Sequence, residues 1–378
     1  MSNKIIPMAS ALLFSASVAA ADVPKVVADI APVHSLVSKI MNGVGRPKLI
    51  IPSINSPHEY QLKPSNAKDI EDANVIFWIG EDLTPWLKKA LSSLGEDATK
   101  IGLLDVDGLN LLDFREGALF EEHDHDDHDD HDDHDDHDDH DDHDDHDDHD
   151  DHDDHDDHDD HDDHDDHDDH KGHDDHDDHD DHDDHKGHDD HDDHDDHDDH
   201  KGHEGHAHGD HDPHAWLSPK AAKVWLNVIA SKLSEVDPDN AGTYFANANS
   251  AKQDLDVLSD EINAILDPMR DKKFVVFHDA YQYFEKDFNI SASGAISLGD
   301  ATDPSPSRLA EIRKRVVDEA VQCVLAEPQY KAGLVAAVVE GTDAKTAVID
   351  PLGAKLEPGV SLYDDLIRNL ATNLAKCF

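Results

Sequence analysis

Residues 26–51 read VVADIAPVHSLVSKIMNGVGRPKLII, and this stretch contains the pattern that decides the fold class. Two apolar, β-branched runs, Val26–Ile30 and Lys48–Ile51, flank a helical pattern over Ser35–Met41. A strand, a helix and a second strand in this order form a βαβ unit, which joins parallel strands of one sheet. The stretch therefore predicts an α/β fold built on a parallel sheet.

The same alternation of strands and helices recurs along the rest of the chain. Strands that are apolar throughout are typical of parallel sheets with helices on both faces. Further strands are predicted at Val75–Ile79, Phe274–His278, Ala295–Leu298, Cys323–Ala326 and Ala347–Ile349, and further helices at Ser65–Asp72, Pro85–Ser93, Pro219–Val236, Ser305–Glu319, Ala332–Gly341 and Leu362–Lys376. Two of these helices have clear starts, because Ser218 and Ser305 each precede a proline as an N-cap residue does.

A longer helical pattern runs from Asp239 to about Leu266 and ends before Asp267-Pro268. Its apolar residues recur every three or four positions, which predicts a single buried stripe. The stripe consists of Ala248, Ala251, Leu255, Leu258, Ile262 and Leu266. This helix could be a rigid connector between two lobes or an ordinary packed helix of one domain. We predict a first lobe over residues 22–238, a connecting helix over 239–268 and a second lobe over 269–378.

Residues 121–211 form a tract in which almost every residue is Asp or His. The tract holds 31 of the 35 histidines and 51 of the 90 acidic residues of the chain. It has almost no apolar surface to bury and its carboxylates repel one another, so we expect it to be disordered. The formal net charge of −59 comes largely from this tract, and it argues against nucleic acid as a partner.

The N-terminus has the pattern of a secretory signal peptide over residues 1–21. Lys4 is followed by an apolar run, and Ala19-Ala20-Ala21 fits a cleavage site before Asp22. The run is too short for a good membrane span, which needs about 20 residues. We therefore expect an exported, soluble, periplasmic protein. Cys323 and Cys377 are the two cysteines of the chain, and an even count in an exported protein favours a disulfide over two buried thiols.

Four histidines lie outside the tract: His34, His58, His214 and His278. His58, His278 and Asp350 follow or end predicted strands, and ligands of parallel sheets bind at that edge. His214 lies just before a predicted helix, whereas His34 lies within one and is expected to be structural. Three imidazoles and a carboxylate suit Zn²⁺, although Asp350 could instead cap the turn at Pro351.

Four motifs in order along the chain resemble the ZnuA-type periplasmic zinc-binding proteins of zinc ABC transporters. The first is SPHEY at residues 56–60, followed by PS at residues 64–65. The others are DPHAWLSP from residue 212, VFHDAY from residue 276 and DPLG from residue 350. The resemblance covers nearly all of the mature chain. It implies two α/β lobes joined by a long rigid helix, with metal between the lobes.

The resemblance also implies which residues bind the metal. His58, His214 and His278 are the implied ligands, and Asp350 matches a carboxylate that manganese-binding relatives use. Its role as fourth ligand is a hypothesis, because water fills that place in some members. Some relatives have a glutamate just before the first histidine, where this chain has Pro57. The two cysteine positions resemble a disulfide of zinc-binding members.

The expected function is capture of Zn²⁺ in the periplasm and its delivery to the membrane permease of an ABC transporter. We expect the protein to be a monomer. The tract expands a His-rich loop of the family, and we expect it to collect zinc weakly; a merely tolerated repeat expansion is the alternative. Two other functions use the same residues: a periplasmic metal buffer or chaperone, and a manganese-binding homologue. The tract favours Zn²⁺, Ni²⁺ or Cu²⁺ over Mn²⁺.

A zinc metalloenzyme is a third alternative, because catalytic zinc also often has three protein ligands and one open position. Such an enzyme needs a positioned general base and a substrate pocket. Glu59, Glu81 or Asp279 could supply the base, but nothing in the sequence organises these residues around the histidines. We therefore expect a binding protein without catalysis.

Overall fold

The computed structural model describes residues 23–115, 120, 211–297 and 303–378 of the 378-residue chain. Three sequence predictions fall outside these ranges and stay predictions. They are the signal peptide over residues 1–21, the disordered tract except for its last residue His211, and the end of one strand at Leu298.

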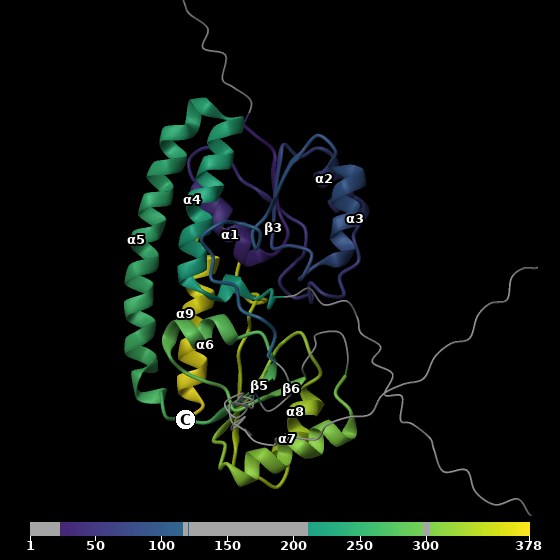
Figure 1. The fold of residues 1–378 in the computed structure, drawn as a ribbon, viewed down its shortest axis with the longest axis vertical. Coiled ribbons are helices and arrows are strands. Elements are labelled where there is room, and N and C mark those ends of the chain that lie inside the picture. The colour runs from purple at the N-terminus through teal and green to yellow at the C-terminus, as the bar shows by residue number, and fades with distance from the viewer. Residues whose placement is uncertain (1–22, 116–119, 121–210, 298–302) are drawn as a thin grey trace, which may run out of the picture. The chain divides into compact units, whose positions relative to one another are not determined.

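The first lobe is built on a four-stranded parallel sheet in the order β2-β1-β3-β4. Its strands are β1 (Val26–Ala28), β2 (Lys48–Leu49), β3 (Val75–Trp78) and β4 (Thr99–Gly102), and its helices are α1 (Ala31–Ile40), α2 (Pro64–Glu71) and α3 (Pro85–Leu94). In Figure 1, α2 and α3 lie on one side of β3, and α1 lies on the other. Because helices cover both faces, every residue of β1 is buried.

The second lobe repeats this design with the order β6-β5-β7-β8, again parallel. Its strands are β5 (Phe274–His278), β6 (Ala295–Ser297), β7 (Cys323–Ala326) and β8 (Lys345–Val348), and its helices are α6 (Gln282–Phe288), α7 (Pro306–Asp318), α8 (Ala332–Val339) and α9 (Leu362–Lys376). In both lobes the strand order reverses between the first strand and the third. Ligands of open α/β sheets bind outside the carboxyl ends of strands at such a switch point.

Two long helices lie between the sheets in the sequence: α4 (Pro219–Val236) and α5 (Ala241–Leu266). Figure 1 shows them side by side, with α9 next to α5. The predicted apolar stripe of α5 is buried in full, and α5 packs against α4 and α1 of the first lobe and α9 of the second. A helix that contacts both lobes fits the connector interpretation better than an ordinary packed helix, and the lobe boundaries at residues 238 and 268 stay predictions.

Several helices begin at residues that favour a helix start, namely proline in the first turn or serine at the N-cap. Proline occupies the first helical turn of α2, α3, α4 and α7, where its missing N–H costs no hydrogen bond. Ser218 and Ser305 act as N-caps, since their hydroxyl oxygens accept from the N–H groups of Ala221 and Arg308. Both cap predictions are confirmed.

Among the described strands and α-helices, one strand and one helix escaped the sequence prediction. β4 is an edge strand with one buried apolar residue, Ile101, so it lacks the apolar run that marks the central strands. α6 has only seven residues and follows the motif at His278 directly. Both are too short for a periodic pattern to stand out.

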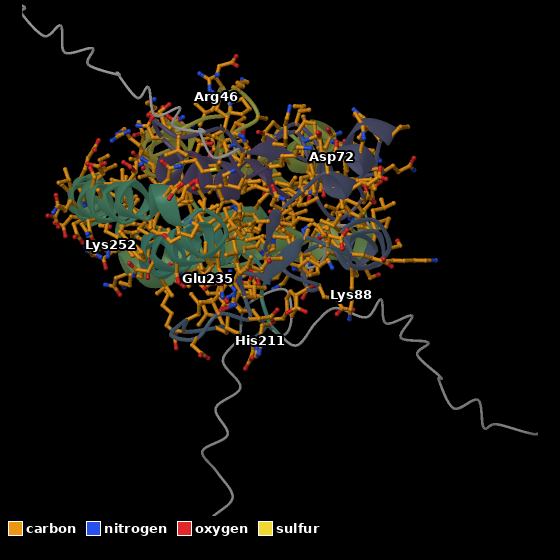
Figure 2. All side chains as sticks on the ribbon, turned by 90° about the horizontal axis from the view of Figure 1, so that it is seen from above. Arg46, Asp72, Lys88, His211, Glu235 and Lys252 are labelled. Carbon is orange, nitrogen blue, oxygen red and sulfur yellow. A yellow bond between two sulfur atoms is a disulfide. The ribbon has the colours of Figure 1, made fainter. Side chains whose placement is uncertain are left out.

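Apolar side chains fill the space between helices and sheets, and charged side chains cover the outside of the helices. Asp72, Lys88 and Glu235 are exposed in this way (Figure 2). Within the described ranges, no helix combines the length and the apolar composition that a membrane span requires.

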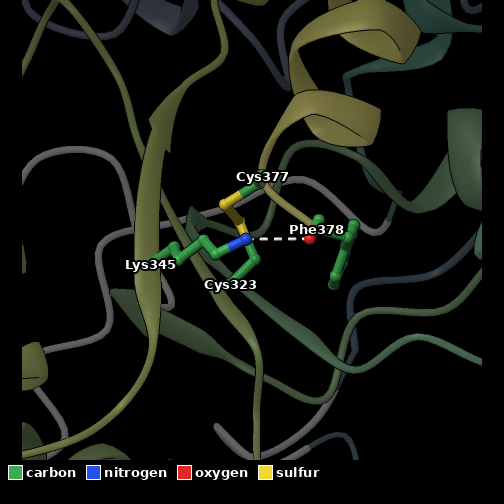
Figure 3. The surroundings of a disulfide bond; sticks show 4 residues. All are labelled: Cys323, Lys345, Cys377 and Phe378. Atoms are coloured by element: carbon green, nitrogen blue, oxygen red, sulfur yellow. Dashed lines mark hydrogen bonds between the residues drawn. A yellow bond between two sulfur atoms is a disulfide. The ribbon is translucent and has the colours of Figure 1, made fainter.

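A disulfide joins Cys323 at the start of β7 to Cys377 just after α9, with 5.8 Å between the Cα atoms. Figure 3 shows it beside Lys345, whose ammonium group donates a hydrogen bond of 2.8 Å to the carbonyl oxygen of Phe378. Both cysteines are buried. Closing a loop of 54 residues stabilises the fold by about 4 kcal/mol on the chain-entropy model. The bridge therefore fastens the C-terminal helix to the second sheet.

Candidate functional site

Three histidines from distant parts of the chain come together at the carboxyl edges of the sheets. His58 lies in the segment after β2, His214 directly precedes a short 3-10 helix at Ala215–Leu217, and His278 is the last residue of β5. The ring centroids of His58 and His214 are 5.8 Å apart, and those of His214 and His278 are 5.3 Å apart. The first two histidines belong to the first lobe and the third to the second.

The ring separations have the size that a shared metal ion requires. Zn–N bonds of about 2.0–2.1 Å in tetrahedral geometry place neighbouring imidazole centroids about 5 Å apart. As the side chains stand, the described residues contain no group of three or more His, Cys, Asp or Glu at metal-binding spacing. Binding would therefore require at least one ring to move toward the other two. His58 is only half-buried and has the most room to do so.

The three rings line a cavity of about 10 Å³. That volume holds about one water molecule or one ion. Trp216, Tyr330 and Leu352 form much of its wall, and Trp216 donates its indole N–H to the carbonyl oxygen of Pro351 at 2.8 Å. An ion in this cavity would lie among aromatic and aliphatic side chains and the polar side chains of Glu327 and Gln329, where electrostatic interactions are less screened than in water.

Two carboxylates that the sequence analysis did not single out support the histidines. Oδ1 of Asp212 lies 2.7 Å from Nδ1 of His214, and Oε1 of Glu327 lies 2.7 Å from Nδ1 of His278. Asp212 precedes His214 by two residues within the quoted DPHAWLSP motif, and Glu327 directly follows β7. An acidic residue at the end of the strand beside β5 was the available signal for Glu327.

Asp350 is placed differently from the histidines. Its Oδ1 accepts from the N–H groups of Leu352 and Gly353 and from the side chain of Gln329, and its Oδ2 accepts from the N–H of Ala354. It is not among the residues that line the cavity. Asp350 thus caps the turn that begins at Pro351, and a metal could use only the remaining capacity of Oδ2. Its role as fourth ligand stays a prediction.

His34 has the structural role that its position in a helix predicts. It is buried in α1, and its Nε2 lies 3.2 Å from the carbonyl oxygen of Pro47. Burial lowers the pKa of His34, because the charged imidazolium would lose its hydration. The residue does not line the cavity of the other three histidines.

The described end of the His/Asp-rich tract, at His211, pairs with the chain at Leu112 and Asp113, close to His214. The N–H of Asp212 donates to the carbonyl oxygen of Leu112 at 2.8 Å, and His211 forms a bridge with Asp113. Nδ1 of His211 also lies 2.9 Å from Oδ1 of Asp113. Figure 2 shows His211 at the surface of the described part of the chain. The end of the tract is therefore held three residues from a candidate ligand.

Arg115 of the first lobe binds two buried carboxylates of the second. Its guanidinium donates to Asp279, which follows His278 directly, and to Glu285 in α6. The three side chains are 18%, 7% and 5% exposed. Burial lowers the pKa of Arg115, but the negative charges of Glu285 and Asp279 outweigh burial and keep it above its ordinary value. This cluster joins the two lobes beside the histidines.

Comparisons with known proteins agree with this architecture. The family model for ZnuA, the periplasmic component A of a zinc-uptake complex, matches residues 26–377. The high-affinity zinc uptake system protein ZnuA of Brucella abortus (strain 2308) is 43% identical over 372 residues, which are 98% of this chain and 97% of the relative. That of Paracoccus denitrificans (strain Pd 1222) is 39% identical over 371 residues, or 98% of this chain and 96% of the relative.

Solved structures show the same fold. A crystal structure of ZnuA has a TM-score of 0.63 at 19% identity and covers 94% of this chain and 99% of its own. A ZnuA deletion mutant with zinc bound has a TM-score of 0.63 at 20% identity and covers 94% and 98%. Since the family model spans nearly the whole sequence and relatives of nearly full length exceed 30% identity, the chain belongs to the ZnuA family of periplasmic zinc-uptake components.

Proposed function

We propose that this protein is a periplasmic solute-binding protein that captures one Zn²⁺ between its lobes and delivers it to the membrane permease of an ABC transporter. The observation that carries the proposal is the meeting of three imidazoles from both lobes at a cavity with room for about one ion. Neutral imidazole is a preferred ligand of zinc. The zinc-uptake proteins that the chain resembles over nearly its full length support the same function.

His58, His214 and His278 are the proposed protein ligands, each through one ring nitrogen. Asp350 is the candidate for the fourth position, because among the described residues its Oδ2 accepts from one donor, the N–H of Ala354, and so has capacity left for an ion. Water is the alternative fourth ligand. X-ray absorption of the zinc complex separates them, since a carboxylate ligand is lost in Asp350→Asn whereas a bound water is retained.

Binding without catalysis suits this site better than hydrolysis. The three rings line a cavity of about 10 Å³, which accommodates about one ion. Two acidic residues considered as general bases are engaged elsewhere, since Asp279 binds Arg115 and Glu81 forms a surface ion pair with Lys88. Glu59 is exposed and does not line the cavity.

The His/Asp-rich tract is proposed to supply zinc to this site. Its end is fixed at His211, close to His214, so an ion released there has a short path to the cavity. Imidazoles bind metal only when neutral, so capture by the tract should fade as the pH falls below about 6.5. Export through a cleaved signal peptide and a monomeric state belong to the same proposal.

Zinc uptake by intact bacteria tests the proposal against a metal buffer that works without a transporter. The host strain lacks its own zinc-uptake binding protein and either keeps or lacks the permease. Expression of this chain should restore growth in zinc-depleted medium only when the permease is present, and His278→Ala should abolish the rescue. Equal rescue without the permease would support the buffer function instead.

A further inference from the structure

We propose that Asp212 and Glu327 are positioning residues that set the zinc affinity of the site by fixing the rings of His214 and His278. This inference rests on the proposed zinc function. Asp212 does not line the cavity, and Glu327, which does, already binds Nδ1 of His278 through Oε1. Each would act through one imidazole, by deciding which ring nitrogen carries the proton and where the other nitrogen points.

The same geometry occurs twice in the molecule. Oδ1 of Asp212 accepts from both the backbone N–H and Nδ1 of His214, at 2.9 and 2.7 Å. Oε1 of Glu327 accepts from both the backbone N–H and Nδ1 of His278, at 3.4 and 2.7 Å. An ionised carboxylate can only accept, so a neutral ring in this position carries its proton on Nδ1 and its lone pair on Nε2. That nitrogen is then ready for a metal.

The two pairs come from unrelated parts of the chain. Asp212 acts on a residue two positions away in the sequence. Its backbone N–H donates to the carbonyl oxygen of Leu112, and its own carbonyl oxygen accepts from the hydroxyl of Tyr283. Glu327 acts across the sheet, from the end of β7 to the end of the neighbouring β5. A hydrogen bond to Nδ1 that arises in both lobes by different routes points to a shared chemical requirement.

Burial makes these contacts effective. Asp212, His214, Glu327 and His278 are all at most 4% exposed. An ion held by three neutral imidazoles would bring two positive charges into this low-dielectric region. Asp212 and Glu327 supply two negative charges one ring away, so the buried complex is close to neutral without a carboxylate ligand. The same charges favour Zn²⁺ binding over binding of a monovalent cation.

The test uses the mature full-length protein and zinc competition against a tight chelator, so that weak sites in the tract do not compete. Loss of such an outer carboxylate typically weakens metal binding about 10–100-fold. We expect a loss of that size for Asp212→Ala and for Glu327→Ala, and a smaller loss for Asp212→Asn and Glu327→Gln, which keep an oxygen acceptor. Asp237→Asn is the matched control, because Asp237 is equally buried but binds Tyr244 and Asn240 instead of a histidine.

Nitrogen-15 NMR of the histidine rings separates positioning from a merely structural role. In the metal-free protein the rings of His214 and His278 should be in the Nδ1–H form. Glu327→Ala should produce a mixture of tautomers at His278 and leave His214 unchanged, and Asp212→Ala should do the reverse. Thermal unfolding of each metal-free variant shows that it is folded.

Two failures have different meanings. If the folded Asp212→Ala and Glu327→Ala proteins bind zinc within about twofold of the wild type, the positioning roles are wrong. If His214→Ala and His278→Ala also bind zinc as tightly as the wild type, the proposed site itself is wrong. Weakened binding with unchanged ring tautomers would also contradict the positioning mechanism.

Discussion

The two sheets have the same strand order, yet the side chains at their carboxyl edges make different kinds of contact at the switch point. In the first lobe Asp29 follows β1, and its two oxygens accept from the N–H groups of Ile30 and Ile79, each at 2.7 Å. In the second lobe the corresponding edge carries His278 and Glu327, which face the cavity. At the first edge the carboxylate of Asp29 binds backbone N–H groups of its own lobe, whereas at the second edge the imidazole of His278 lines the cavity. Shared topology therefore defines where a ligand could bind, and the side chains decide whether it does.

The first lobe contributes to the site by another route. Its histidines lie on connections, with His58 in the segment after β2 and His214 before the 3-10 helix at Ala215–Leu217. Contacts within the first lobe hold both connections, since Trp86 donates to the carbonyl oxygen of Pro57 and Asp212 donates to that of Leu112. The second lobe adds a contact to one of them, because Tyr363 of α9 donates its hydroxyl to the carbonyl oxygen of Trp216 at 2.9 Å. The second lobe's part of the site lies at the end of a sheet strand, whereas the first lobe's part lies on connections that contacts within the lobe and between the lobes hold in place.

The largest stability effect should come from Arg115, which supports the second edge from the first lobe. Arg115→Ala leaves Asp279 and Glu285 buried without a cation, so we expect the free energy of unfolding to fall by about 3–5 kcal/mol. Urea unfolding measures this change. The control is Arg368→Ala, because the Arg368–Glu261 pair is about 40% exposed and should cost at most about 1 kcal/mol. Equal losses would show that the buried cluster of Arg115, Asp279 and Glu285 stabilises the fold no more than an exposed ion pair does.

Asp29 tests whether the first edge is a closed structural feature. Burial raises the pKa of Asp29 to about 7, against the hydrogen bonds from Ile79 and Ile30 that lower it. The folded state thus binds the proton more tightly than the unfolded state, whose pKa is about 4. Stability from this proton is present below about pH 4 and is lost as the pH rises through 7, by on the order of 4 kcal/mol in total.

Urea unfolding between pH 4.5 and 7.5 checks this prediction. The wild type should become less stable across this window relative to Asp29→Asn, which cannot titrate. Zinc affinity at neutral pH should be unchanged in the variant if it is folded. Parallel pH profiles for the two proteins would contradict the assignment of this window to Asp29.

The smallest effect compares two helix caps. Ser305 caps α7 within the second lobe, so Ser305→Ala should cost about 1 kcal/mol. Ser218 caps α4 and also donates its hydroxyl to Asp287 of the other lobe at 2.7 Å. Ser218→Ala should therefore cost more than Ser305→Ala by roughly another 1 kcal/mol. Thermal unfolding of both variants gives the difference, and equal costs would mean that the contact between the lobes adds nothing.

Sequence patterns sufficed where structure is local. The apolar stripe of α5, the two serine caps and strands β5 and β7 were predictable, because periodicity and capping depend on neighbouring residues. The short edge strand β4 was missed because it buries only Ile101. Motif resemblance singled out His58, His214 and His278. These residues are far apart in the sequence and match no short motif, yet their rings lie close together in the structure.

Glu327 and Arg115 escaped prediction for a different reason. Each acquires its role from a partner far along the chain, Glu327 from His278 and Arg115 from Asp279 and Glu285. The place of Glu327 after a predicted strand was a signal for the sheet edge, but the neighbouring residues do not identify His278 as its partner. The order of strands at the sheet edge supplies that information, and only the folded structure gives it.

Zinc titration of the metal-free mature protein, by calorimetry, tests the central claim most directly. A form without residues 124–204 is measured in parallel, together with single changes of His58, His214 and His278 to alanine and with His34→Gln as the control histidine. One tight equivalent should persist without the tract, fall by more than about 100-fold in each alanine variant and stay unchanged in His34→Gln. Loss of tight binding on removal of the tract, with the three alanine variants unaffected, would contradict a site between the lobes.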